Sequence, residues 1–144
     1  MSGDSSLGIG IGLALKSYGR GFSGLLDQYP GAAAAYSLRK LSSSTSNVVR
    51  VRRSIDNDEK DFTSAEVSDG TLESFCGVGD GFVETWYDQS GNGNDATQSV
   101  AGNQPKIVDG GSLVTGGIEF DGVDDYFLSS HILSSDDVLS LYAV

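Results

Sequence analysis

Short apolar runs broken by single polar residues are the main structural signal in this chain. Residues 48–53 and 81–87 are rich in valine and aromatic side chains, a composition and spacing typical of strands. Each run is followed by residues that favour tight turns, at 56–58 and at 88–94. Shorter strand-like segments follow at 95–98, 106–108, 117–120, 126–128 and 138–144. The pattern therefore predicts a mainly β fold.

The first 24 residues have a different pattern. Residues 8–15 alternate between small and large aliphatic residues, so a strand here would have one aliphatic face and one nearly bare face. Such a strand is weak alone and would gain from pairing with another chain, although a disordered segment or an ordinary intramolecular strand fits the pattern equally. We interpret residues 1–24 as a glycine-rich docking arm, with assembly contacts from Gly8, Ile9, Gly10, Ile11, Gly12 and Leu13.

One segment favours a helix. Residues 31–41 follow Pro30 and contain four consecutive alanines, and proline in a first turn followed by alanine is a good helix start. Basic residues at 39 and 40 suit the negative end of a helix dipole. Asp27 is a candidate cap, and the serines of residues 42–46 would end the helix.

The charge distribution narrows the range of partners. A net charge of −11 over 144 residues disfavours a protein that follows nucleic-acid phosphates. Five of the nine basic residues nevertheless fall within one short segment, and we interpret them as strand-end residues that pair with the acids at 56–61. These five are Arg39, Lys40, Arg50, Arg52 and Arg53.

The cysteine count and the length of the apolar stretches indicate where the protein is made and whether it enters a membrane. The single cysteine, Cys76, excludes an intrachain disulfide and lies in an apolar run, where we expect a small buried side chain. The first residues lack the basic region of a signal peptide, and the apolar stretch at 7–15 is too short to span a bilayer. We therefore expect a protein made in a cytoplasm, without membrane insertion.

Three blocks together suggest a fold family. Residues 86–98 form a strand, a glycine–asparagine loop and a second strand; residues 104–107 and then 118–126 follow. This series resembles the concanavalin A-like, laminin-G-type sandwiches of secreted glycan-binding proteins and phage fibres. The expected fold is mainly β: a partial concanavalin-like jelly-roll sandwich over residues 25–144, with one short N-terminal helix. We expect a longer polypeptide or neighbouring subunits to complete its sheets.

A longer resemblance covers roughly residues 32–144. Several spaced blocks are similar to the start of the fungal-type α-L-arabinofuranosidase B catalytic domain, at residues 35–38, 51–56, 61–62, 75–76 and 87–94. In those enzymes the cysteine that matches Cys76 has a disulfide partner, which residues 81–86 do not supply. Their catalytic carboxylates lie beyond the matched region, so we expect no enzyme. Similar stretches occur in tail-fibre and virion proteins of marine phages.

The resemblance implies a structural protein of a phage virion, as a tail-fibre or attachment protein with a lectin-like domain. Its expected partners are other virion proteins, further copies of itself (a trimer is one option) and a host-surface glycan. Two alternatives stay open: an arabinofuranosidase-like hydrolase without its catalytic half, and a head decoration protein.

Two sets of loop residues are candidates for binding. Sugar sites pair an exposed aromatic ring with amides, and Tyr87 should face away from its core-facing neighbour Trp86. The candidate glycan site is therefore Tyr87, Asn92 and Asn94. No cofactor is expected, but calcium would suit the oxygen donors of Asp88, Asp121, Asp124 and Asp125. Because these aspartates have no EF-hand spacing and lie in glycine-containing loops, building turns is their alternative role.

Overall fold

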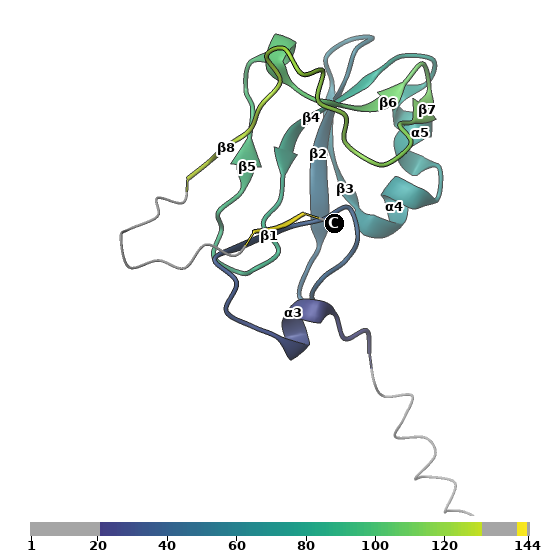
Figure 1. Ribbon diagram of the computed structural model, residues 1–144. Helices are drawn as coiled ribbons and strands as arrows, with labels where there is room; N and C mark the ends of the chain where they lie inside the picture. Colours follow the sequence, from purple (N-terminus) through teal and green to yellow (C-terminus); the bar gives the residue numbers. More distant parts are fainter. Residues whose placement is uncertain (1–20, 131–140, 144) are drawn as a thin grey trace, which may run out of the picture.

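A computed structural model of the chain describes residues 21–130 and 141–143 (Figure 1). The proposed assembly residues 8–13 lie outside this range. The described helices are α3 Leu25–Gln28, α4 Ser64–Ser68 and α5 Thr71–Cys76. The strands are β1 Ala34–Tyr36, β2 Asn47–Arg53, β3 Glu59–Thr63, β4 Gly81–Trp86, β5 Ala96–Thr97, β6 Lys106–Asp109, β7 Ser112–Leu113, β8 Leu128–Ser129 and β9 Leu141–Ala143.

The mainly β class is confirmed: the strands form a curled antiparallel sheet with the shape of half a barrel, a partial sandwich. Its strand order is β3-β2-β4-β5-β8, and β6 pairs with both β4 and β7. Strand β1 instead pairs in parallel with β9, as a separate two-stranded sheet. The segments predicted as strands at 48–53, 81–87 and 106–108 correspond to β2, β4 and β6.

Strand β4 lies at the centre of the sheet and divides its neighbours. Along one edge it pairs with β2 over nearly its whole length. Along the other edge, its last residues Thr85 and Trp86 pair with β5, whereas its first residues Gly81 and Phe82 pair with β6. The strands β5 and β6 therefore pair with opposite ends of the same edge of β4. The connection at residues 98–105 joins them and lies where they separate.

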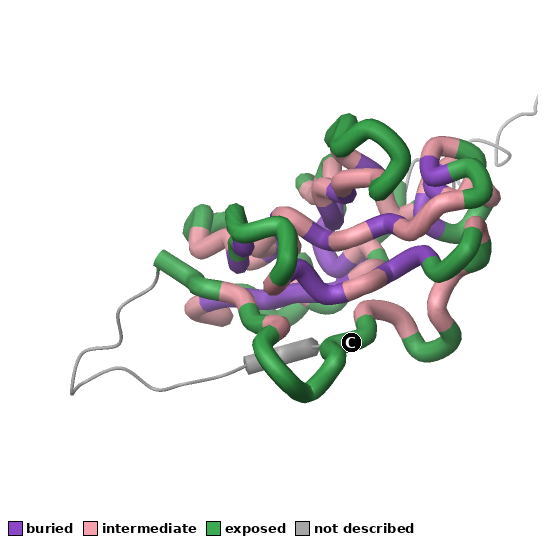
Figure 2. Tube along the Cα trace, turned by 90° about the horizontal axis from the view of Figure 1, so that it is seen from above, coloured by how far each residue is buried: buried purple, intermediate pink, exposed green. Residues whose placement is uncertain are grey.

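The two-residue period of β2 and β4 separates a buried face from a polar one. Val49, Val51 and Val83 are fully buried, whereas the residues between them are only half-buried. The buried side chains pack with Phe62, Leu72, Val67, Cys76, Ile107 and Val108 into the main core. The short helices α4 and α5 contribute Val67, Leu72 and Cys76 to it (Figures 1 and 2).

The alanine-rich helix predicted at 31–41 is wrong. The only described helix near it is α3, one turn long and before the alanines, and residues 34–36 form β1. Ala35 is fully buried; its N–H donates to the Asp88 carboxylate, and its C=O accepts the Gln89 N–H. Those tertiary hydrogen bonds and the burial outweigh the helix propensity of alanine, which amounts to only a few tenths of a kcal/mol per residue. Asp27 does act at a helix start, accepting the N–H of Gly24 at 2.7 Å.

The ion pairs predicted for the basic cluster are present for Arg50 and Arg53; within the described residues, Arg39, Lys40 and Arg52 make none. Arg50 pairs with Glu59 and Asp61, each at 3.0 Å, and Arg53 pairs with Asp56 at 2.8 Å and Asp58 at 3.5 Å. In the predicted turn at 56–58, Asn57 adopts a φ of 65°, a left-handed conformation that asparagine tolerates. The cluster thus joins β2 to β3 and to the turn between them.

Candidate functional site

The loop at residues 88–94 holds β1 against the main sheet. The two carboxyl oxygens of Asp88 accept four hydrogen bonds, from the N–H groups of Ala35, Ser90 and Asn94 and from the Ser90 hydroxyl, at 2.7–3.0 Å. This is the turn-building role proposed as the alternative for the loop aspartates. The side chain that was a candidate calcium ligand is therefore already hydrogen-bonded to its own loop and to β1.

The amides proposed for glycan binding serve the same loop. The Asn92 Nδ2 group donates to the carbonyls of Ala32 and Ala33 at 2.9 and 3.1 Å, and Asn94 Nδ2 donates to Ala33 at 2.8 Å. Their amide N–H groups thus secure the strand that precedes β1. Asn92 stays exposed and keeps its amide oxygen for other contacts.

The side chains of Tyr87 and Trp86 have different neighbours. The Trp86 ring packs between Tyr36 and Phe127, with ring centroids 5.7 and 6.2 Å away, but it is only half-buried. Tyr87 is half-buried, and its hydroxyl donates to Asp61 at 2.8 Å. It lines a hollow of about 330 Å³ together with Ser44, Thr45, Ser46, Asn47, Asp88, Gln89 and Gly91. Asn92 and Asn94 are not among the residues that line this hollow.

The structure brings together three of the four proposed calcium ligands. One carboxyl oxygen from each of Asp121, Asp124 and Asp125 lies within 4.8 Å of the other two, whereas Asp88 is not part of this group. Asp121 Oδ1 already accepts the N–H groups of Val123 and Asp124, at 2.9 and 3.2 Å. The first of these bonds in particular lowers the pKa of Asp121. The cluster supplies three oxygen ligands, while calcium takes six to eight.

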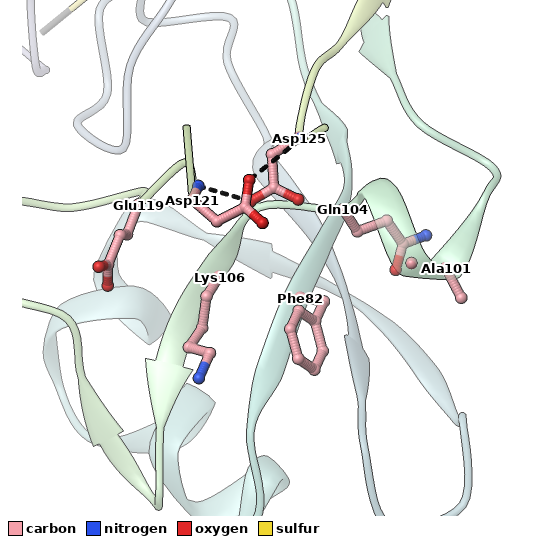
Figure 3. Close-up of a pocket in the computed structure, with 8 residues that line it drawn as sticks. Phe82, Ala101, Gln104, Lys106, Glu119, Asp121 and Asp125 are labelled. Carbon is pink, nitrogen blue, oxygen red and sulfur yellow. Dashed lines mark hydrogen bonds between the residues drawn. The ribbon is translucent and has the colours of Figure 1, made fainter. Parts of the chain in front are cut away.

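A larger pocket lies beside this aspartate turn. It has a volume of about 430 Å³, in the range of small-molecule sites, and lies beneath the connection where β5 and β6 separate. An aromatic ring, an amide, a cation and several carboxylates line it, as Figure 3 shows. These residues are Phe82, Ala101, Gly102, Gln104, Lys106, Glu119, Asp121 and Asp125.

Two buried glutamines lie at this pocket: Gln104 lines it, and Gln98 supports Gln104 from behind. Gln104 is almost fully buried, and its Nε2 donates to the carbonyl of Gln98 at 2.8 Å. The Gln98 side chain in turn donates to the carbonyl of Tyr126 at 3.0 Å. These bonds replace the strand pairing that is lost where β5 and β6 diverge, and they tie the aspartate turn to the sheet.

The charged groups of the pocket with perturbed pKa values are held in their ionised forms. Lys106 donates to Asp109 at 2.7 Å and lies 3.3 Å from Asp80, and these carboxylates, Asp109 first, raise the pKa of the lysine. The pKa of Asp121 is lowered, as described above. A general acid or base instead needs a pKa moved towards neutrality. The pKa shifts of Lys106 and Asp121 therefore run away from neutrality.

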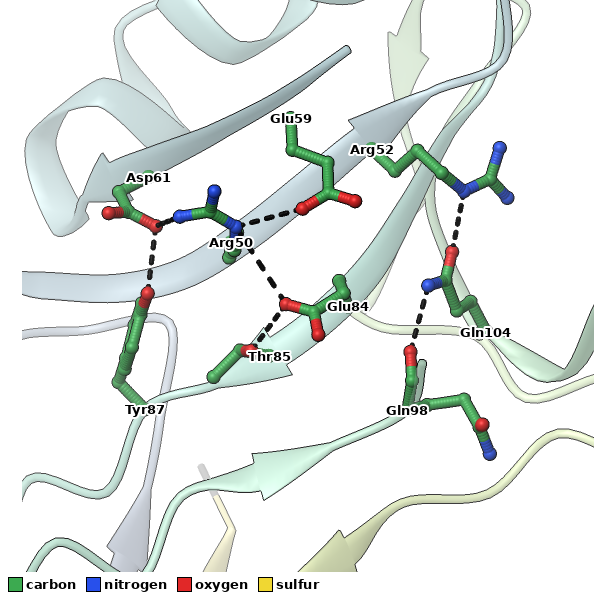
Figure 4. Close-up of polar contacts among 9 residues, drawn as sticks. All are labelled: Arg50, Arg52, Glu59, Asp61, Glu84, Thr85, Tyr87, Gln98 and Gln104. Atoms are coloured by element: carbon green, nitrogen blue, oxygen red, sulfur yellow. Dashed lines mark hydrogen bonds and ion pairs between the residues drawn. The ribbon is translucent and has the colours of Figure 1, made fainter. Parts of the chain in front are cut away.

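The polar face of β2 and β4 carries a separate network (Figure 4). Arg50 is shared by the carboxylates of Glu59 and Asp61 and lies 3.8 Å from Glu84. Further along the same strand, Arg52 Nε donates to Gln104 Oε1 at 2.8 Å. The guanidinium carbon of Arg52 also lies 4.9 Å from the centroid of the Phe82 ring. Arg52 is thus in contact with two of the residues that line the pocket.

Sequence reasoning missed this pocket because its parts come from distant segments. Phe82, Gln104 and Asp125 meet only because β4 is central and the 98–105 connection crosses above it. Phe82 and Lys106 did carry a signal: in alternating strands their side chains fall on the face opposite the core valines. Gln98 and Gln104 lie outside such alternating strands, so the sequence pattern does not indicate where their amides point.

No family model, curated protein or solved structure matches this chain. The structure also contains, among its described residues, no helix that is long and apolar enough to cross a membrane. The interpretation of the site therefore depends on its own geometry and chemistry.

Proposed function

We propose that the protein is a non-enzymatic, lectin-like attachment protein of a phage virion, and that the pocket around Phe82 binds a host-surface glycan. One observation carries the binding half of the proposal: the 430 Å³ pocket combines an aromatic side chain with amide, ammonium and carboxylate groups. Sugar rings present both C–H faces and hydroxyl groups, so they suit a pocket with both kinds of wall.

The pocket is a better candidate than the loop around Tyr87. The amide groups of Asn92 and Asn94 are occupied by the backbone near β1, and the Tyr87 hydroxyl is occupied by Asp61. In the pocket, the Glu119 side chain is exposed and makes no hydrogen bond or ion pair with the rest of the described chain. An exposed carboxylate of this kind is available to accept ligand hydroxyls.

The absence of catalysis is part of the proposal. The carboxylates of Asp88 and Asp121 accept backbone N–H groups of their own loops, which supports a structural role for each. The virion setting is supported by the resemblance to phage tail-fibre proteins and by the docking-arm pattern of residues 8–15.

A glycan microarray tests the binding half. The purified chain should bind a defined subset of glycans, and replacing Phe82 by alanine should abolish that binding. The control is Tyr87→Phe, which leaves the pocket intact and should bind as the parent does. If the parent chain binds no glycan, or if Phe82→Ala binds normally, the pocket is not a sugar site.

Two further measurements test the setting. Peptide mass spectrometry of purified phage particles should detect the chain, and a variant without residues 1–15 should fail to be incorporated. Normal incorporation of the shortened chain would remove the docking role. Release of nitrophenol from a nitrophenyl arabinofuranoside by the full polypeptide would instead favour the hydrolase, and many copies on an icosahedral shell would favour a head decoration protein.

A further inference from the structure

Arg52 differs from the two other arginines of its strand. Arg50 and Arg53 each pair with at least two carboxylates, at distances from 2.8 to 3.8 Å. Arg52 pairs with none of the carboxylates in the described parts of the chain, although acids outnumber bases by 20 to 9 in this protein. A half-buried guanidinium without a carboxylate partner is unusual in such an acidic molecule.

The strand register alone would give Arg52 an acidic partner. Glu59 lies directly opposite Arg52 in the pairing of β2 with β3, but its carboxylate bonds to Arg50 Nε at 3.0 Å. On the other side, the residue opposite Arg52 is Phe82, whose ring lies under the guanidinium. The nearest cross-strand carboxylate is thus turned towards Arg50.

Neutral groups fix the position of the Arg52 side chain. Its Nε donates to Gln104 Oε1 and its Nη1 to Asn57 Oδ1, both at 2.8 Å, and its Nη2 donates to the carbonyl of Ala101 at 3.3 Å. These bonds use three of the five N–H groups of the guanidinium and leave two. Ala101, Gln104 and Phe82 all line the pocket, so the guanidinium lies next to it, although Arg52 is not itself among the lining residues.

The acidic residues that line the pocket, which form its acidic wall, have the reverse charge. They are Glu119, Asp121 and Asp125, and Asp121 Oδ1 and Asp125 Oδ2 each accept backbone N–H groups of the aspartate turn. Lys106, which also lines the pocket, is already paired with Asp80 and Asp109. A ligand with negative charge at both ends would be repelled by the acidic wall, whereas sugar hydroxyls can donate to it.

We propose that the pocket selects a saccharide with one carboxylate, of the uronic or sialic acid class. The ligand carboxylate binds the remaining N–H groups of Arg52, the sugar ring contacts Phe82, and its hydroxyls face the acidic wall. This inference rests on the proposed glycan-binding function and adds the charge and orientation of the ligand. Sulfated, multiply charged polysaccharides are excluded by the same acidic wall.

The test uses an array that carries neutral, singly carboxylated and sulfated glycans. The carboxylated class should bind most strongly. For the strongest binder, conversion of the sugar carboxylate to its methyl ester should weaken binding at least about tenfold, the usual effect of losing a hydrogen bond to a charged group. Because the change is made on the ligand, protein folding is not affected.

The matching protein variant is Arg52→Gln, with Arg39→Gln as a control of equal net charge. Arg52→Gln should lose the preference for the carboxylate over its ester, Arg39→Gln should retain it, and Arg52→Lys should restore only part of it because lysine lacks the planar fork. Equal binding of acid and ester by the parent chain would overturn this inference and leave glycan binding standing. Binding to no glycan at all would overturn both.

Discussion

Gly81 lies against the sulfur of Cys76: a Cβ atom at position 81 would stand 2.7 Å from Sγ. It would also meet the side chains of Val51 and Val108, each at 3.1 Å. All three neighbours are fully buried in the main core, so they have little room to move. We expect Gly81→Ala to lower the free energy of unfolding by about 1–3 kcal/mol, the usual cost of overpacking. Urea denaturation, monitored by circular dichroism, measures this change in the free energy of unfolding.

Gly102 provides the control, because no atom lies within 4 Å of a Cβ built there. Gly102→Ala should therefore change stability little. The contact with sulfur can be isolated by a double mutant: in a Cys76→Ala background, Gly81→Ala should cost less than in the parent, since the two positions share one space. Strictly additive costs would show that the valines, not the sulfur, limit the site.

The thiol of Cys76 should be unreactive in the folded protein. The side chain is fully buried, and burial raises the pKa of the thiol to about 11, so little thiolate forms near neutral pH. We expect labelling by a disulfide reagent such as DTNB to proceed only at the rate of unfolding and to become immediate in denaturant. Fast labelling of the native chain at pH 8 would contradict the packing of α5 against β4.

Two elements have a clear signal in the sequence, although only the first of them was predicted. Strand β2 was predicted because Val49 and Val51 alternate with arginines. When one face of a segment is buried, a two-residue period indicates a strand. The helix α4 was missed although its signal is local: Thr63 and Glu66 form a capping box, with Thr63 Oγ1 accepting the Glu66 N–H at 3.2 Å. The three-residue spacing of threonine and glutamate was visible in the sequence.

The pairing of the arginines shows where sequence patterns were not sufficient. Arg50, Arg52 and Arg53 lie next to the same group of acids, and composition predicts ion pairs for all of them. The register of β2 with β3 places Glu59 opposite Arg52, yet the Glu59 carboxylate bonds to Arg50, and Arg52 has no acidic partner in the described parts of the chain. Such an assignment depends on the three-dimensional neighbours of each side chain.

Asp88 should be the most important side chain of its loop for stability. It accepts four hydrogen bonds, one of which reaches Ala35 in β1, so alanine at this position would leave several N–H groups without their acceptor. We expect Asp88→Ala to lower the free energy of unfolding by about 3 kcal/mol. Asp124→Ala, which removes an exposed carboxylate that accepts no hydrogen bond within the described chain, is the matched control and should be nearly neutral. Equal losses would show that the Asp88 bonds do not hold β1.

The aspartate turn should bind calcium weakly. It supplies three carboxyl oxygens, and one oxygen of Asp121 is already shared by backbone N–H groups. Because calcium takes six to eight ligands, we expect the melting temperature to be the same in 1 mM calcium and in EDTA, within about 1 °C. A rise of several degrees that disappears in Asp125→Asn would establish a calcium site at this turn.

Tyr87 should give the protein a pH dependence at the alkaline end. Burial, and then the hydrogen bond to Asp61, raise the pKa of Tyr87 to about 12, above the value of 10.0 that applies without such contacts. The folded state thus holds this proton more tightly than the unfolded state, so the stabilising effect is complete below pH 10 and is lost as the pH rises from 10 to 12.

Tyr87→Phe removes this titration while it keeps the ring. The variant should lose about 1 kcal/mol at pH 7 with the hydroxyl's hydrogen bond, and its stability should then fall less steeply than that of the parent between pH 10 and 12. Urea midpoints measured at intervals from pH 7 to 11.5 compare the two slopes. Tyr29→Phe, at an exposed position, controls for the loss of any tyrosine hydroxyl. Parallel curves for the parent and Tyr87→Phe would mean that the Asp61 bond does not persist in solution.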